Sequence, residues 1–369
     1  MKKRIAVFLG TRPEALKLAP VIRAIQKEKF FDLQTVLTAQ HREMIDQVLR
    51  LFHIRVGADL DLMTENQTLA SLSQKLLSRL GSVFRRLRPD LVMVQGDTTT
   101  ALIVSLFAFY EKIPVAHVEA GLRSRNKYHP FPEEINRRLI SHLADYHLAP
   151  TPEARENLLK EGIRPDRISV TGNTVIDSLL WMKKNLKPAY LRFKNIDFSK
   201  RVILLTAHRR ENIGKPLVEI ARAARRLLNH FKDLEIVYPV HLNPGVQKII
   251  QNTLNGTPRM HLLPPLPYDE TVYLMNQSYL ILTDSGGIQE EAPSLGKPVL
   301  VLREVSERPE GIRAGALKVV GTQSKSIVRE AARLLQSKTD YAQMARVRNV
   351  YGDGKASERI VKQLKAWLC

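Results

Sequence analysis

The chain has 369 residues, a hydrophobic content of 44%, a charged content of 25% and a formal net charge of +20. This length suits two domains, and no apolar run approaches the roughly 20 residues that a membrane-spanning helix needs. The single cysteine, Cys369, excludes an internal disulfide and a cysteine-based metal site, so we expect a cytoplasmic protein.

The positive charge raises nucleic acid as a partner. The Lys and Arg residues are scattered, however, and the chain has neither a basic tail nor an RNA-binding aromatic signature. We therefore expect no nucleic-acid partner and no membrane partner. A polyanionic small substrate, or solubility alone, accounts for the charge.

Short β-branched runs alternate with longer amphipathic segments from the N-terminus onward. In the first half, strands are expected at 4–10, 32–39, 91–96, 115–120, 146–150 and 168–172. After a polar stretch at 185–200, further strands are expected at 201–207, 235–240, 261–265, 279–285 and 298–302. Apolar strands separated by helices predict parallel sheets that are covered on both faces.

Two such series predict an α/β fold with two facing Rossmann-like domains and an active site in the cleft between them. We expect the domains to span residues 1–172 and 173–354. We expect the tail, about 355–369, to form a helix that packs back on the first domain. Ligands of such sheets bind beyond the carboxyl ends of the strands, so the residues found there are the candidates for a site.

Polar and charged residues follow nearly every expected strand. The cationic ones suit a diphosphate, because guanidinium groups bind phosphate oxygens in pairs and lysine acts as a point charge; they are Arg12, Lys17, His208, Arg209 or Arg210, and Arg308. The acidic ones suit proton transfer, because carboxylates in a closed site raise one another's pKa; they are Asp97, Glu119 and Glu133 or Glu134.

Taken singly, these residues have structural interpretations as well. Asp97 could cap a helix that opens with threonines, and Glu133 and Glu134 could open a helix after proline. His208 and His241 could be hydrogen-bonded structural histidines. The joint placement of all these polar residues at strand ends favours a ligand-binding site.

The stretch DSGGIQEEAPSLGKP, residues 284–298, predicts a binding loop for a nucleotide diphosphate. A strand delivers Ser285 to the start of a helix, where backbone N–H groups are free. Gly286 and Gly287 let a diphosphate approach the backbone. Glu291, one turn beyond, is the candidate ribose ligand.

Several chemistries are excluded by missing motifs. The chain has no G-x-x-x-x-G-K-[ST] loop, and its first strand turns into GTRPEA rather than G-x-G-x-x-G, which argues against a nicotinamide fingerprint. Neither G-x-S-x-G nor H-E-x-x-H occurs. No His or acid spacing requires a metal.

Six blocks together resemble the non-hydrolysing UDP-N-acetylglucosamine 2-epimerases. They are GTRPEA, QGDTTT, HVEAGLRS, FPEEINRR, AHRREN and TDSGGIQEEAPSLGKPVLVLREVSERPEG, in the family's order. The resemblance runs from residue 5 to about 322. It implies the glycosyltransferase-B architecture and the interconversion of UDP-GlcNAc and UDP-ManNAc without a nicotinamide cofactor or metal, supplying ManNAc-type sugars for surface polysaccharide.

In that family UDP is eliminated to give 2-acetamidoglucal and is then added back with the opposite configuration at C2. The resemblance implies Asp97, Glu119 and Glu133 as acid/base groups, with His208 beside the diphosphate. It places Arg12 and Lys17 at the nucleotide and acid/base cluster, and Arg308 near the reaction centre. Ser285, Gly286, Gly287 and Glu291 match the family's diphosphate and ribose ligands.

The resemblance also implies a homodimer, and a second UDP-GlcNAc as an allosteric activator. The residues that resemble the activator site are Gln40, Gln67, Glu134, Arg209 or Arg210, and His241. An epimerase for a modified sugar nucleotide, such as a 2,3-diacetamido uronic acid, is the alternative on the same scaffold. A glycosyltransferase is a more distant alternative, since it would not need Asp97, Glu119 and Glu133 together, and a non-enzymatic sugar-nucleotide sensor is more distant still.

Overall fold

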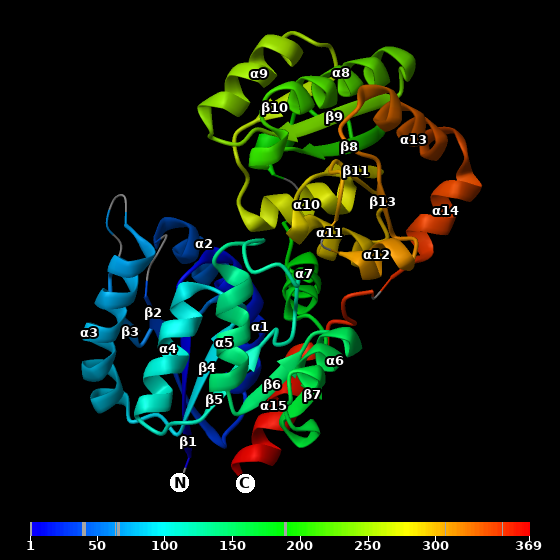
Figure 1. Ribbon diagram of the computed structural model, residues 1–369. Helices are drawn as coiled ribbons and strands as arrows, with labels where there is room; N and C mark the ends of the chain where they lie inside the picture. The colour runs from blue at the N-terminus through cyan, green and yellow to red at the C-terminus, as the bar shows by residue number, and fades with distance from the viewer. Residues whose placement is uncertain are drawn as a thin grey trace. The chain divides into compact units, whose positions relative to one another are not determined.

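We describe the protein from a computed structural model in which residues 2–38, 42–62, 64, 67–187, 190–306, 308–348 and 350–369 are placed. The chain divides into two compact units, and parallel strands form the centre of each (Figure 1). The first unit is Met1–Ser178 with Gly352–Cys369, and the second is Leu179–Tyr351.

The first unit is built on a parallel sheet with the strand order β3-β2-β1-β4-β5-β6-β7. Its strands are β1 (Lys3–Leu9), β2 (Phe31–Leu37), β3 (Ala58–Asp59), β4 (Leu91–Gln95), β5 (Val115–Val118), β6 (Tyr146–Ala149) and β7 (Ile168–Val170). The strand order reverses between β1 and β4, which pair with Ile5 opposite Leu91. Ligands of doubly wound sheets bind beyond the strand ends at this kind of switch point.

Helices cover this sheet because their apolar stripes match the buried strand residues. They are α1 (Arg12–Gln26), α2 (Arg42–Phe52), α3 (Leu69–Leu87), α4 (Thr99–Tyr110), α5 (Glu133–Leu143), α6 (Pro152–Lys160) and the start of α7 (Thr174–Lys184). Leu76 and Leu80 of α3 and Val104 of α4 pack with Phe8 and Val94 in one core. The C-terminal helix α15 (Ala356–Leu368) packs against α1, and its Trp367 stacks on Tyr146.

The second unit repeats the scheme with the strand order β10-β9-β8-β11-β12-β13. Its strands are β8 (Arg201–Thr206), β9 (Leu234–Pro239), β10 (Met260–Leu263), β11 (Leu280–Thr283), β12 (Val299–Val301) and β13 (Leu317–Val319). Here the order reverses between β8 and β11. The segments of His208 and Ser285 follow β8 and β11, so both leave the sheet at this second switch point.

The helices of the second unit follow the same logic. They are α8 (Lys215–His230), α9 (Pro244–Leu254), α10 (Tyr268–Gln277), α11 (Gly286–Glu291), α12 (Pro309–Arg313), α13 (Ser324–Gln336) and α14 (Lys338–Arg346), with the short 3-10 turns η2 (Leu191–Phe193), η3 (Arg210–Asn212) and η4 (Ala292–Leu295). A further turn, η1 (Pro165–Arg167), belongs to the first unit. Leu217, Leu227, Val246 and Leu334, from α8, α9 and α13, share one core with the sheet.

The predicted fold class, α/β with two Rossmann-like domains, is confirmed. Two strands escaped the sequence analysis, β3 and β13, which have 2 and 3 residues. Both are edge strands, and each is too short to give an apolar run that can be recognised in the sequence. Among the placed residues no helix is long and apolar enough to cross a membrane.

Candidate active site

The turn that follows β4 carries Asp97. Its carboxylate pairs with the guanidinium of Arg137 on α5, and Asn136, the neighbour of Arg137, donates from Nδ2 to the Asp97 carbonyl at 2.9 Å. The capping interpretation of Asp97 is wrong: the N-cap of α4 is Thr98, whose hydroxyl accepts from the Ala101 N–H at 3.0 Å. The Asp97 carboxylate therefore does not cap α4 and is held by Arg137.

Glu119 follows β5, the strand next to β4. Its φ of +66° lies in the left-handed region, which is strained for a residue with a side chain and is a kind of strain that active sites often retain. Its carboxylate lies 2.5 Å from Nζ of Lys17 on α1. Both side chains are largely enclosed, with exposures of 10% for Glu119 and 14% for Lys17.

Glu133 and Glu134 open α5, yet they are placed differently. Glu134 is fully buried and accepts backbone N–H groups from Ser124 at 2.8 Å and Arg125 at 3.2 Å. Arg137 also lies 3.4 Å from its Oε2. The Oε2 atom of Glu133 is buried and has no hydrogen-bond partner among the placed residues, so Glu133 retains a carboxylate oxygen for a ligand or a proton.

The segment after β8 is fixed by a buried carboxylate from the end of β11. Asp284 is fully buried, and its Oδ2 accepts from the N–H groups of His208 and Arg209, both at 2.8 Å. The side chain of Asn212 donates to the same oxygen at 2.9 Å. One residue therefore sets the path of the segment that carries the candidate cations.

His208 stacks on His241, with ring centroids 5.2 Å apart. Partial burial lowers the pKa of His208, and Arg209 and His241 act in the same direction, while Asp284 opposes them. The imidazole is therefore mainly neutral near pH 7, and one ring nitrogen can accept a proton or a hydrogen bond.

The double glycine, Gly286 and Gly287, lies close to two arginine side chains. A Cβ placed on Gly286 would lie 3.5 Å from Nη2 of Arg209 and 3.5 Å from Nη2 of Arg308. On Gly287 it would lie 3.8 Å from Oε1 of Glu291. The bare backbone of Gly286 thus faces two guanidinium groups, which is a suitable environment for phosphate oxygens.

The two acids of this loop are both buried and have different partners. Glu291 accepts from the Tyr268 hydroxyl at 2.7 Å. Glu290 accepts from Nε of Arg308 at 2.6 Å and lies 2.6 Å from its Nη2. Tyr268 therefore orients the candidate ribose ligand, and Glu290 orients the candidate phosphate cation. The helix ends at Glu291 and continues as η4 through Pro293.

The remaining candidates are more scattered. Arg12 opens α1, Gln67 donates from Nε2 to the Leu62 carbonyl at 2.9 Å, and Arg210 is exposed at the start of η3. Ser285 precedes α11 and donates its N–H to Thr283 Oγ1 at 2.9 Å. Gln40 lies outside the placed residues.

Sequence reasoning missed four residues that organise these groups: Asp284, Glu290, Asn136 and Arg137. Each lies inside a motif that was quoted, but no spacing rule links it to its partner. Arg137 is 40 residues from Asp97 and Asp284 is 76 residues from His208. One signal was present for Arg137, which follows Glu133 by four residues and so lies on the same side of α5.

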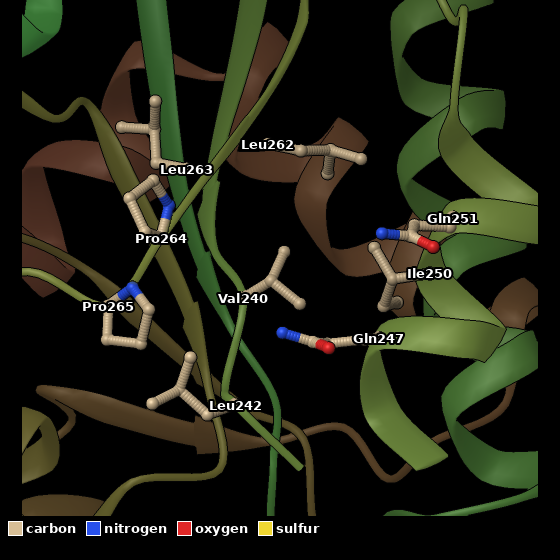
Figure 2. Close-up of a pocket in the computed structure, with 9 residues that line it drawn as sticks. All are labelled: Val240, Leu242, Gln247, Ile250, Gln251, Leu262, Leu263, Pro264 and Pro265. Carbon is tan, nitrogen blue, oxygen red and sulfur yellow. The ribbon is translucent and has the colours of Figure 1, made fainter. Parts of the chain in front are cut away.

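A separate pocket of about 210 Å³ lies between α9 and the ends of β9 and β10 (Figure 2). It is lined by Val240, Leu242, Gln247, Ile250, Gln251, Leu262, Leu263, Pro264 and Pro265. None of these nine side chains is charged, so the pocket does not suit a diphosphate. Within the placed part of the chain, no group of three or more His, Cys, Asp or Glu residues could hold a metal ion.

Carboxylates after neighbouring strands of one Rossmann-like unit, and guanidinium groups around a double glycine in the other, are the arrangement expected of a nucleotide-sugar enzyme of the glycosyltransferase-B fold class. A solved glycotransferase of kitacinnamycin shares this fold, with a TM-score of 0.69 over 100% of both chains at 10% identity. The particular family is shown by its sequence model: residues 23–365 match UDP-N-acetylglucosamine 2-epimerase, and the chain belongs to this family.

Two relatives illustrate the match. UDP-N-acetylglucosamine 2-epimerase of Escherichia coli (strain K12) is 47% identical over 369 aligned positions, which cover 98% of each chain. The crystal structure of UDP-GlcNAc 2-epimerase from Neisseria meningitidis bound to UDP-GlcNAc has a TM-score of 0.90 and 47% identity, covering 99% of this chain and 100% of that one. The family resemblance of the motifs is confirmed.

Proposed function

We propose that this protein interconverts UDP-GlcNAc and UDP-ManNAc by eliminating UDP to give 2-acetamidoglucal and adding UDP back with the opposite configuration at C2. The substrate is the one named for the similar enzymes of Escherichia coli and Neisseria meningitidis. The product would supply ManNAc-type sugars for surface polysaccharide.

The observation that carries this proposal is the pair of carboxylates after β4 and β5. Asp97 and Glu119 leave neighbouring strands, and each is paired with a cation, Arg137 or Lys17. An epimerase must serve two faces of C2, so it needs more than one acid/base group. Glu133, whose buried Oε2 atom has no hydrogen-bond partner among the placed residues, supplies a third candidate.

The groups of the second unit suit the other half of the reaction. The C2 proton is weakly acidic, because its neighbour is an acetal carbon, so its removal must be coupled to the departure of UDP. Arg209, Arg308 and His208 would stabilise the charge that develops on the diphosphate, and Glu291 would bind the ribose. In this scheme the first unit moves protons, with Arg12 and Lys17 beside its carboxylates, and the second holds UDP.

The test is exchange of the C2 proton. Incubation with UDP-GlcNAc in D₂O should place deuterium at C2 and yield UDP-ManNAc, as followed by NMR. A panel that includes UDP-2,3-diacetamido uronic acids identifies the preferred sugar. Absence of exchange with every UDP-HexNAc would overturn the proposed reaction, and exchange with the uronic acids alone would change its substrate.

We propose in addition that a second UDP-GlcNAc activates the enzyme. The candidate contacts are Gln40, Gln67, Arg209 or Arg210, and His241, and the stacking of His241 on His208 offers a direct physical link to the diphosphate group. Glu134 could join them only if its present partners moved. Initial rates with UDP-ManNAc alone should be low and should rise when UDP-GlcNAc is added; full activity without it contradicts obligatory activation.

We further propose a homodimer formed through α3 and α5. These helices flank α4 on one side of the first unit and expose apolar side chains, namely Leu69 (43%), Leu77 (37%), Ile135 (37%) and Leu139 (47%). Light scattering should give a dimer mass that Leu139→Glu reduces. Leu191→Glu, at a more exposed leucine of the second unit, is the matched control, and an unchanged dimer in Leu139→Glu contradicts this interface.

A further inference from the structure

The turn formed by Gly96, Asp97 and Thr98 is held by buried side chains from other elements. His117 on β5 contacts the Gly96 carbonyl through Nε2 at 2.6 Å, and Asn136 on α5 donates to the Asp97 carbonyl at 2.9 Å. Their exposures are 0% and 6%. These two bonds thus fix consecutive carbonyls, one on each side of the Asp97 Cα atom.

Holding both carbonyls restricts the direction of the Asp97 side chain. The Gly96 carbonyl belongs to the peptide plane before Asp97, and the Asp97 carbonyl belongs to the plane after it. Because peptide planes are rigid, fixing both planes fixes φ and ψ of Asp97 and hence its Cα–Cβ bond. The carboxylate is then delivered to Arg137, which neighbours Asn136 on the same helix.

The hydrogen bond of His117 also identifies its protonation state. A carbonyl oxygen only accepts, so Nε2 carries the hydrogen, and Nδ1 is buried without a partner among the placed residues. Burial lowers the pKa of His117 to about 4, and Arg123 and Arg137 act in the same direction. His117 is therefore a neutral, fixed donor and not a group that exchanges protons with substrate.

The same side chains connect the three candidate carboxylates. His117 lies on β5, two residues before Glu119, and its hydrogen bond joins the Asp97 turn to that strand. Asn136 lies three residues after Glu133 on α5. The hydroxyl of Thr98, the last residue of the turn, donates to buried Glu14 at 2.7 Å. The turn is therefore held from three elements, α1, β5 and α5.

We propose that His117 and Asn136 are positioning residues that orient the Asp97 carboxylate for proton transfer at C2. The inference rests on the proposed function, since it assigns Asp97 a proton-transfer role. It predicts that loss of either donor slows the chemical step while leaving nucleotide binding intact.

The test compares matched substitutions at His117. His117→Leu keeps the approximate volume and removes the donor, whereas His117→Gln keeps an N–H near the position of Nε2. We expect kcat to fall about 10- to 100-fold in His117→Leu, because small misplacements of a reacting group have effects of this size. KM and the Kd for UDP should stay within about twofold of wild type, and His117→Gln should recover most of the loss.

Two further variants separate positioning from general destabilisation. His147, the equally buried register partner of His117 on β6, gives the control His147→Leu, which should lower Tm without changing kcat. Asn136→Asp, which replaces the donor with an acceptor of the same shape, should reproduce the kcat loss of His117→Leu. It carries the test alone if His117→Leu does not fold.

The Asp97→Asn background completes the design. With the carboxylate gone, His117→Leu should cause no further loss of residual C2 exchange, whereas an independent structural effect would add to it. Wild-type turnover in both His117→Leu and Asn136→Asp, with Asp97→Asn impaired, overturns the positioning role alone. Wild-type turnover in Asp97→Asn overturns the acid/base assignment and the positioning role with it.

Discussion

At the carboxyl edge of the first sheet, buried N–H donors from His117 and Asn136 hold backbone carbonyls of the Asp97 turn. At the corresponding edge of the second sheet, the buried carboxylate of Asp284 holds the backbone N–H groups of His208 and Arg209. In the first unit hydrogen-bond donors hold the backbone that carries a carboxylate. In the second unit a carboxylate holds the backbone that carries a histidine and a cation.

The difference follows from what each edge must keep available. Each carboxylate of the first edge already has one cation, Arg137 or Lys17, and the neutral donors beneath hold the backbone without adding a further cation. Cations that meet a diphosphate gain from a buried carboxylate, which offsets their mutual repulsion before the ligand arrives. Substitutions of the carboxylates in the first unit should therefore change kcat, and a substitution at the double glycine of the second, which leaves the cations in place, should change nucleotide affinity.

The largest expected effect breaks the acid/base set of the first unit. Glu119→Gln keeps the shape of the side chain and removes the charge that pairs with Lys17. We expect kcat to fall by about 10²- to 10⁴-fold, the range typical of a lost acid/base group, while the Kd for UDP changes less than about threefold. Coupled assays and calorimetry measure the two quantities, and near-normal turnover would show that Glu119 transfers no proton.

The next effect concerns the response of the first unit to acid. Burial lowers the pKa of His117 to about 4 and that of His147 to about 3, from 6.5. Below pH 6.5 the unfolded chain therefore binds more protons than the folded chain, so stability is full above pH 6.5 and falls as pH drops towards 4. Each histidine should remove about 3 kcal/mol over this window.

Buried Glu14 opposes this trend, since burial raises its pKa and its proton stabilises the fold just above pH 4.5. The share of His147 is isolated by His147→Gln, whose stability should fall less between pH 6.5 and 4. Trp367 lies in the first unit and Trp181 in the second, so urea unfolding in a Trp181→Phe background reports the first unit. Equal pH slopes with and without His147 would contradict the prediction.

Sequence reasoning reached the same limit at both edges. Apolar runs and their spacing predicted both sheets, because buried parallel strands require them, and the strand ends predicted Asp97, Glu119, His208 and Gly286 as neighbours of ligand. The supporting residues could not be found this way. Asn136 lies 39 residues from the carbonyl that it holds, and only the folded chain brings such pairs together.

The smallest expected effect tests the second unit at Gly286. A Cβ there would lie at ordinary contact distance, 3.5 Å, from the guanidinium groups of Arg209 and Arg308, so Gly286→Ala should fold with an unchanged Tm. The added methyl group would stand where a phosphate oxygen approaches the backbone. We expect the Kd for UDP to rise about 10-fold, equivalent to about 1.4 kcal/mol, with kcat at saturation little changed.

The control is Gly81→Ala on α3, at a glycine remote from the site. Its new methyl group would lie 3.4 Å from its nearest neighbour, and the Kd of this variant for UDP should match that of wild type. A loss of kcat in Gly286→Ala without a change in Kd would contradict the division of roles between the units. Weaker UDP binding at constant kcat would instead assign nucleotide affinity to the double glycine, and leave proton transfer to the carboxylates that follow β4 and β5.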